Sequence, residues 1–242
     1  MSANNWTSYG ITHIGKIRKT NQDTFLNLPN KQLWMVADGM GGHQAGELAS
    51  GAIADALRSF KPAKTLGSTV MTIYHELIKV NCRLVDLAST SGDNRVIGST
   101  VAILLVWQQH SICLWSGDSR IYLFRKGKLR QLSRDHNYES KLLAKGYSDE
   151  EVKIQPFIQT LTHAIGGETD LYLEAQIQEI RPGDIFLLCS DGLNKEVNDT
   201  EIECILNITP IEQVTSHLLE RSLDGGGRDN ITVVVSYFDT PS

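Results

Sequence analysis

Five short motifs, each built around an aspartate, follow one another along this chain of 242 residues. They are Asn21-Gln22-Asp23, Asp38-Gly39-Met40-Gly41-Gly42-His43, Gly117-Asp118-Ser119-Arg120, Ser190-Asp191-Gly192 and Arg228-Asp229-Asn230. Asp38 and Asp191 each follow an apolar run of the kind that forms a buried strand. A carboxylate at the end of such a strand costs free energy unless it is paired or bound to a cation. The pattern therefore indicates a site for hard cations.

Magnesium and manganese are the ions that such a site would suit, because they prefer oxygen ligands and keep several waters. Asp38, Asp191 and Asp229 could each present a carboxylate from a strand end. Gly39 could add its carbonyl, because a residue without a side chain lets the main chain approach the ion. Two ions about 3.5–4 Å apart can share one water and make it a nucleophile at neutral pH. Such a water could attack phosphorus without a covalent enzyme intermediate.

A phosphate substrate also needs a fixed cation and a proton for its leaving oxygen. Arg18, just before the first motif, could bind two phosphate oxygens with its planar guanidinium. His43, after the two glycines Gly41-Gly42, could act as general acid. Taken singly, each residue has an ordinary interpretation, since an Asp-Gly pair is usually a turn and a lone His or Arg usually lies on the surface. The ordered set favours a catalytic site.

The elements that must position these residues come in blocks of strands and blocks of helices. We expect strands over residues 9–14, 24–28, 32–37, 99–107, 111–116, 120–125, 128–132, 172–180, 185–189 and 231–238. We expect helices over residues 45–60, 68–88, 138–145, 199–206 and 210–221, with a capping box opening another short helix at Ser148. Blocks of this kind predict an α+β fold, a four-layer αββα sandwich of two antiparallel sheets flanked by helix pairs.

The composition is ordinary for a globular protein, with 41% hydrophobic and 21% charged residues. We expect one catalytic domain over residues 1–242. The net charge of −5 argues against a nucleic-acid partner. The longest apolar run, residues 101–107, is too short to enter and span a bilayer, and the N-terminus has no hydrophobic signal core. The four cysteines form no C-x-x-C pair, so we expect buried, reduced thiols in a cytoplasmic protein.

From about Trp6 to Phe238 the chain resembles the metal-dependent serine/threonine protein phosphatases of the type 2C (PPM) family, in their compact bacterial form. The most specific matches are Gly15-x-x-Arg18-x-x-Asn21-Gln22-Asp23 and the motif that starts at Asp38. Later matches are Gly98-Ser99-Thr100, Gly117-Asp118-Ser119-Arg120, Ser190-Asp191-Gly192 and Asp229-Asn230-Ile231-Thr232. The αββα sandwich is the fold of that family.

The resemblance implies a role for each matched residue. Asp38 would bridge two core Mn²⁺ or Mg²⁺ ions, with Gly39 supplying a carbonyl, and Asp191 and Asp229 would complete the shell of the first ion. The roles implied for the other positions are Asp23 in the outer shell of the second ion, Asp118 on a weaker third ion, Arg18 on the substrate phosphate and His43 as the proton donor. Residues 135–157 fall where the family has a mobile flap.

Three positions depart from the usual family pattern. His163 stands where many members have arginine, Gln22 where many have glutamate, and Arg228 where a small residue is common. None removes a metal ligand, so they bear on substrate preference. A basic cluster in and around the predicted hairpin of residues 120–132 is interpreted as its solvated face, with a docking surface for an acidic phosphoprotein as the alternative. The cluster consists of Arg120, Arg125, Lys126, Lys128, Arg130 and Arg134.

The sequence thus predicts a monomeric enzyme that hydrolyses phosphoserine and phosphothreonine in proteins, with a cognate bacterial Ser/Thr kinase as its counterpart. One alternative is a catalytically weak phosphoprotein-binding regulator of the same fold, but a binding protein has no need to keep Asp38, Asp191 and Asp229 together. A two-metal nuclease is another, and the acidic balance and the absence of a basic, aromatic-lined groove signature argue against it.

Overall fold

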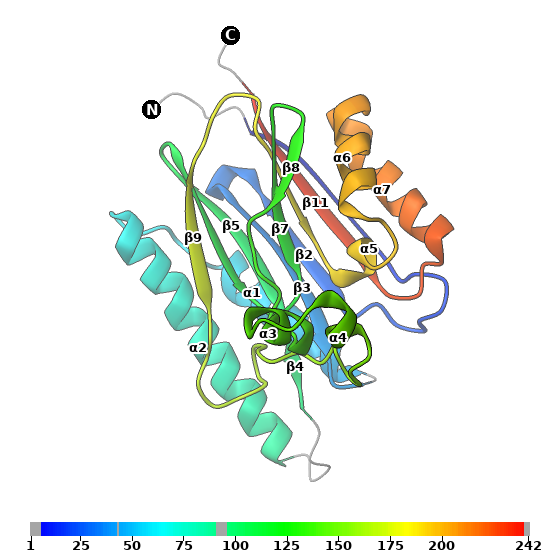
Figure 1. Ribbon diagram of the computed structural model, residues 1–242. Coiled ribbons are helices and arrows are strands. Elements are labelled where there is room, and N and C mark those ends of the chain that lie inside the picture. The colour runs from blue at the N-terminus through cyan, green and yellow to red at the C-terminus, as the bar shows by residue number, and fades with distance from the viewer. Residues whose placement is uncertain (1–5, 43, 91–95, 240–242) are drawn as a thin grey trace.

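The computed structural model describes residues 6–42, 44–90 and 96–239, and their strands form two antiparallel sheets (Figure 1). The first sheet has the order β1 (Trp6–His13), β11 (Ile231–Phe238), β10 (Ile185–Cys189), β7 (Arg120–Arg125) and β8 (Lys128–Gln131). The second has the order β2 (Asp23–Leu28), β3 (Leu33–Met40), β5 (Val101–Trp107), β6 (His110–Ser116) and β9 (Glu174–Glu179). A short strand, β4 (Gly98–Ser99), pairs with the end of β3.

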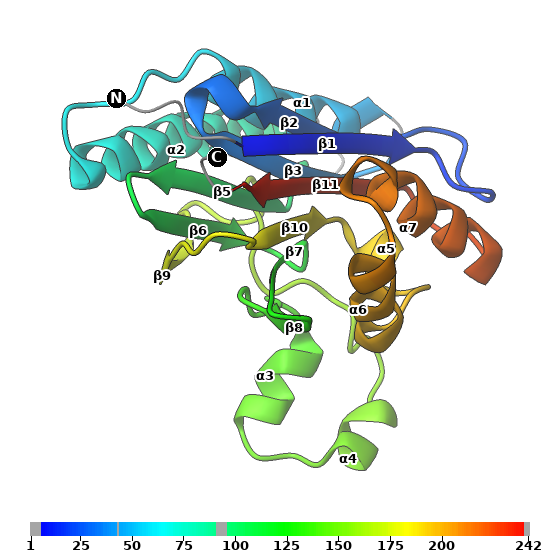
Figure 2. The same cartoon turned by 90° about the horizontal axis from the view of Figure 1, so that it is seen from above.

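Helices cover the outer face of each sheet (Figure 2). On the second sheet these are α1 (Gln44–Arg58) and α2 (Leu66–Thr90), and on the first they are α6 (Asp199–Ile208) and α7 (Ile211–Gly225). The predicted four-layer αββα arrangement is therefore confirmed. None of the helices in the described residues is long and apolar enough to cross a membrane.

The strands in the middle of the sandwich are buried on both faces, and alternate side chains enter different layers. Trp34 of β3 points into the apolar layer between the sheets, whereas its neighbour Met35 packs beneath α1 and α2. In β10, Phe186 enters the layer between the sheets and Leu187 packs beneath α6 and α7. This period of two explains why the runs are continuously apolar in sequence.

Most predicted elements agree with the structure to within a few residues, but the expected strand 99–107 is interrupted at Thr100. The backbone of Thr100 donates a hydrogen bond to the Asp38 carbonyl (2.9 Å), while Ser99 pairs with Ile165. The expected strand 172–180 is shorter, Glu174–Glu179, and the helix expected over 210–221 extends to Gly225. The one-turn helix α5 (Asp191–Asn194) was not predicted, because four residues carry no helical period.

Between β8 and β9 the chain leaves the layers and forms α3 (Tyr138–Ala144) and α4 (Asp149–Lys153), which project from the sandwich (Figure 2). The predicted capping box is present, since Ser148 and Glu151 exchange hydrogen bonds at the start of α4. The expectation of buried thiols is correct for Cys113 and Cys189 and wrong for Cys82 and Cys204, which are exposed.

Candidate metal centre

The predicted metal ligands lie at one edge of the sandwich, where strands of both sheets begin or end. Asp23 starts β2 and stands opposite Asp38 of β3 in the strand register. Asp191 opens α5 just after β10, Asp229 lies just before β11, and Asp118 lies in the turn between β6 and β7. All of them except Asp23 line a cleft of about 340 Å³. The structure therefore brings together carboxylates that are far apart in the sequence.

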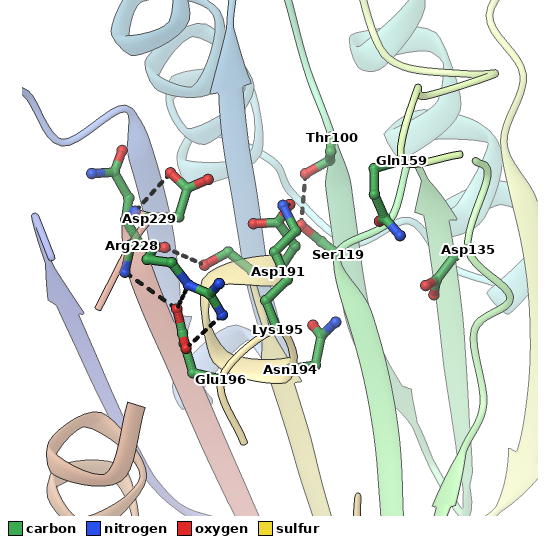
Figure 3. A network of polar contacts seen from close by, with 12 residues as sticks. Thr100, Ser119, Asp135, Gln159, Asp191, Asn194, Lys195, Glu196, Arg228 and Asp229 are labelled. Carbon is green, nitrogen blue, oxygen red and sulfur yellow. Dashed lines mark hydrogen bonds and ion pairs between the residues drawn. The ribbon is translucent and has the colours of Figure 1, made fainter. Parts of the chain in front are cut away.

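The backbone of Asp38 is held by hydrogen bonds on both its N–H and its carbonyl. Its N–H donates to Oγ1 of Thr100 (3.0 Å), and its carbonyl accepts from the backbone of Thr100 (2.9 Å) and from Oγ of Ser99 (2.9 Å). The Thr100 hydroxyl also shares a hydrogen bond of 2.7 Å with Ser119 (Figure 3). The Gly98-Ser99-Thr100 motif thus fixes the end of β3 and leaves the Asp38 carboxylate available for a ligand.

Asp23 joins the two sheets. It is 7% exposed, and its Oδ2 accepts hydrogen bonds from Ser190 and Thr232, both at 2.7 Å. Ser190 follows β10 and Thr232 lies in β11, so both hydroxyls come from the opposite sheet. The other oxygen, Oδ1, is buried and has no hydrogen-bond partner among the described residues. Asp23 therefore keeps one oxygen for water or an ion.

Gly39 is required by close packing against helix α1. A Cβ at this position would lie 2.0 Å from the carbonyl oxygen of Gly46 and 2.8 Å from that of Gln22. The Gly39 N–H donates to the same Gln22 carbonyl (3.1 Å). Any side chain would push the start of α1 away from the end of β3, so the Asp-Gly pair is here a packing requirement as well as a candidate ligand.

Asn230 ties the loop that carries Arg18 to the loop that carries Asp229. Its Oδ1 accepts from the backbone of Gln22 (2.9 Å), and its Nδ2 donates to the carbonyls of Ile14 (2.9 Å) and Thr20 (3.0 Å). One amide side chain therefore fixes both ends of the segment around Arg18.

Two cationic side chains form ion pairs with these carboxylates. Nη2 of Arg18 is 2.8 Å from Oδ2 of Asp229. Nζ of Lys195 contacts Oδ2 of Asp191 (Figure 3). Arg18 is 54% exposed at its side chain and reaches in from the rim, as a phosphate-binding residue must. Lys195 was not identified from the sequence. A signal existed, since Lys195 follows Asp191 by one helical turn, but it depended on the unpredicted helix α5.

The carboxylates strongly perturb one another. Burial raises the pKa of Asp38 well above its ordinary range, and the charges of Asp23, Asp191, Asp118 and Asp229 raise it further. Burial also raises the pKa of Asp23 to about 6 and that of Asp118 to about 7, with the charge of Asp191 adding to each. A cluster of this kind is unfavourable until cations neutralise it.

The residues fit a magnesium or manganese centre. The donors are oxygens, and two of the buried ones, Oδ1 of Asp23 and Oδ1 of Asp191, have no hydrogen-bond partner among the described residues. Within that same part of the chain, no three His, Cys, Asp or Glu side chains are placed to hold an ion by themselves. That arrangement suits Mg²⁺ and Mn²⁺, which retain several waters and bind through few carboxylates, better than an ion that needs a complete protein cage.

The raised pKa values predict how the metal-free protein responds to pH. The pKa of Asp118 is about 7 in the folded protein, against an ordinary value of 3.8. The folded state therefore holds a proton that the unfolded state has lost, and this group's contribution to stability falls as pH rises through that interval. In chelator, Asp118→Asn should gain thermal stability relative to wild type as the pH is raised, as measured by circular dichroism. A stability difference that does not change with pH would contradict the assignment.

Of three further sequence-based positions, the structure describes two, His163 and Arg228. His43 is outside the described residues. His163 stacks on Tyr172 with ring centroids 4.2 Å apart and lines a different cavity, beside α3. Arg228 pairs with Glu196, Nε to Oε1 at 2.7 Å (Figure 3). Neither His163 nor Arg228 lines the cleft that holds the carboxylates.

The basic hairpin cluster is largely used by the fold itself. Arg120 forms an ion pair of 2.8 Å with Asp135. Arg125 forms one of 2.7 Å with the fully buried Asp184. Lys128 pairs with Glu203 at 3.1 Å. The interpretation as a solvated face is thus wrong for Arg120 and Arg125, and the charge available to an acidic docking partner is reduced.

Comparisons with known proteins agree with this fold and this site. The Protein phosphatase 2C family profile matches residues 8–142. The serine/threonine phosphatase stp of Listeria welshimeri is 32% identical over 233 residues, 93% of this chain and 92% of the relative. The structure of PppA, a key regulatory component of the T6SS in Pseudomonas aeruginosa, has a TM-score of 0.89 at 38% identity, covering 96% of this chain and 97% of that one.

A second solved structure, the catalytic domain of the serine threonine protein phosphatase PstP in complex with two manganese ions, has a TM-score of 0.83 at 29% identity. The match covers 97% of this chain and 99% of that one. The sandwich fold, the carboxylates that both sheets bring to one edge, and these relatives indicate the class of metal-dependent protein serine/threonine phosphatases. This chain belongs to the Protein phosphatase 2C family.

Proposed function

We propose that the chain dephosphorylates phosphoserine and phosphothreonine in proteins at the cleft beside Asp38, and that it reverses the action of a cognate bacterial Ser/Thr kinase. The observation that carries the proposal is the meeting of buried, mutually repelling carboxylates with a rim arginine in one open cleft. Such a cleft suits a phosphate ester only after cations have neutralised it.

The roles of the metal ligands are those that the family resemblance implies. Asp38 would serve both core ions, with Gly39 supplying a carbonyl. Asp191 and Asp229 would complete the shell of the first ion, and Asp23 would act from the outer shell of the second. Asp118 would hold a third, weaker ion. When bound, Mn²⁺ or Mg²⁺ supplies charge stabilisation of the phosphoryl oxygens and a water that is acidic enough to act near neutral pH.

Phosphate binding, positioning of the Arg18 loop and proton donation would be carried out by side chains of the protein. Arg18 would transfer one or more N–H donors from Asp229 to the phosphate oxygens, because its guanidinium is half exposed and its partner is needed by an ion. Asn230 would keep the Arg18 loop in register with Asp229 during that exchange. His43 would give a proton to the leaving oxygen of serine or threonine.

The segment around α3 and α4 would control access for the protein substrate. Residues 135–157 form the projecting part of what we take to be one catalytic domain over residues 1–242. Gln159 and Leu161, just beyond α4, line the carboxylate cleft itself. Movement of this flap would therefore reach the cleft wall directly. We further propose that the protein acts as a cytoplasmic monomer.

The test is release of phosphate from a phosphothreonine peptide by the purified chain. We expect full activity with Mn²⁺ or Mg²⁺, none in excess EDTA, and recovery when the metal is restored. A phosphotyrosine peptide of the same sequence serves as the control for substrate class. Undiminished activity in excess chelator would refute the metal mechanism, and metal binding without any turnover would favour the alternative of a phosphoprotein-binding regulator.

A further inference from the structure

Lys195 places a positive charge inside the carboxylate centre. It follows Asp191 by one helical turn, and its Nζ contacts Oδ2 of Asp191. Its side chain lines the cleft that holds Asp38, Asp118 and Asp229, and it also lines an adjoining cleft of about 420 Å³. Lys195 is therefore a lining residue of the candidate metal centre as well as part of an i,i+4 helical ion pair.

The contact differs from an ordinary helical ion pair in what surrounds it. Lys79 and Glu76 form a comparable pair of 2.7 Å on α2, but Lys79 is 68% exposed, and exposed pairs of this kind contribute little. Lys195 instead faces Asp191, which is 8% exposed and has an unpartnered Oδ1 in the described structure. Its ammonium also acts on the charges of Asp118 and Asp229.

Asp118 lines the same cleft as Lys195. Asp118 is 7% exposed, Asp191 is the charged group that most disfavours its ionised form, and Lys195 is the charged group that most favours it. The Asp118 and Asp191 carboxylates and the Lys195 ammonium thus form one electrostatic unit. A divalent ion that enters between these carboxylates must overcome the repulsion of the lysine or displace it.

We propose that Lys195 is a tethered cation that competes with an added ion for Asp118 and Asp191, and so keeps the third metal site weak. The proposal rests on the proposed function's assignment of a third ion to Asp118. The lysine neutralises part of the carboxylate cluster in the metal-free protein, and it moves aside only when the concentration of the ion is high. Its side chain is 39% exposed on a flexible stem, which permits that movement.

The experiment counts bound manganese by electron paramagnetic resonance of the free ion, without any substrate. Lys195→Met keeps the length of the side chain and removes its charge, so the weakest ion should bind about tenfold tighter or more. The metal-free protein should at the same time lose thermal stability, because the carboxylates lose their cation. Lys195→Arg keeps the charge and should bind the weakest ion as wild type does. Lys79→Met, the matched loss of a helical lysine, should change neither quantity.

A second pair of variants assigns the gain to its site. Asp118→Asn combined with Lys195→Met should lose the tighter ion, and Lys195→Gln should reproduce the effect of Lys195→Met if the methionine variant folds poorly. Unchanged binding of the weakest ion in both charge-removing variants would overturn the proposal, as would a gain that survives Asp118→Asn. Phosphate release is measured separately, so an inactive enzyme that shows the predicted shift in ion binding would refute the proposed function and leave this inference standing.

Discussion

Replacing Asp38 with asparagine should lower the turnover of a phosphothreonine peptide by about 10²–10⁴-fold and should also raise the stability of the metal-free protein. The first effect follows because a carboxylate that serves both core ions contributes several kcal/mol to the transition state, and about 1.36 kcal/mol corresponds to a factor of ten. The second follows because the Asp38 carboxylate is buried among like charges, which raise its pKa. Asparagine has the same shape without the charge.

The two effects are measured on the same preparation, by phosphate release at saturating Mn²⁺ and by thermal unfolding in EDTA. Asp55→Asn provides the matched control, because Asp55 lies on α1 and pairs with Arg58 at the exposed surface. It should alter neither quantity appreciably. Near wild-type turnover of Asp38→Asn would show that Asp38 does not serve the core ions. A metal-free protein that is less stable than wild type would show that the cluster is already neutralised.

Arg18 and His43 should be separable by their kinetic effects. Arg18 would contact the phosphate in the ground state and the transition state alike, so Arg18→Ala should raise KM and can lower kcat as well. His43 would act when the leaving oxygen needs a proton, so His43→Ala should lower kcat on a phosphothreonine peptide by about 10²–10⁴-fold. On p-nitrophenyl phosphate, whose leaving group needs little protonation, the same variant should be much less affected.

The comparison is made at saturating Mn²⁺ with both substrates for each variant. His217→Ala, a change at an exposed histidine of α7 that does not line the cleft, is the control for loss of an imidazole. Equal losses on the two substrates would indicate that His43 positions the loop and is not the proton donor. An Arg18→Ala variant with unchanged KM would indicate that Arg18 serves only as the partner of Asp229.

The sequence was sufficient for the layers and for naming the carboxylates that meet at one edge of the sandwich, because both depend on local patterns. An Asp-Gly pair at the end of an apolar run, or an Asp-Asn pair at the start of one, can be recognised in the sequence, and the motif order around Asp38 and Asp191 is specific. The break at Thr100 was not legible, since it depends on hydrogen bonds to Asp38 across two strands. Helix α5 was missed because one turn has no period, and Lys195 was missed with it.

The hydrogen bonds of the buried hydroxyls could not be predicted from single motifs either. Ser190 and Thr232 belong to recognised motifs, but their shared partner Asp23 is far away in the chain. The role of Asn230 likewise depends on three backbone groups between residues 14 and 22. Such contacts depend on how the two sheets stack on each other. The periodicity of apolar residues within one strand does not indicate which residues of the other sheet will lie opposite.

The bonds from Asp23 to Ser190 and Thr232 make ion binding and sheet stacking linked equilibria. Asp23 and Asp38 belong to one sheet, whereas Asp191 and Asp229 adjoin strands of the other. An ion held by both sets must stabilise the stacked sheets by the same free energy by which stacking favours the ion. The apolar layer around Trp34 and Phe186 would then contribute to metal affinity, although the layer is built from apolar side chains and not from the candidate ligands.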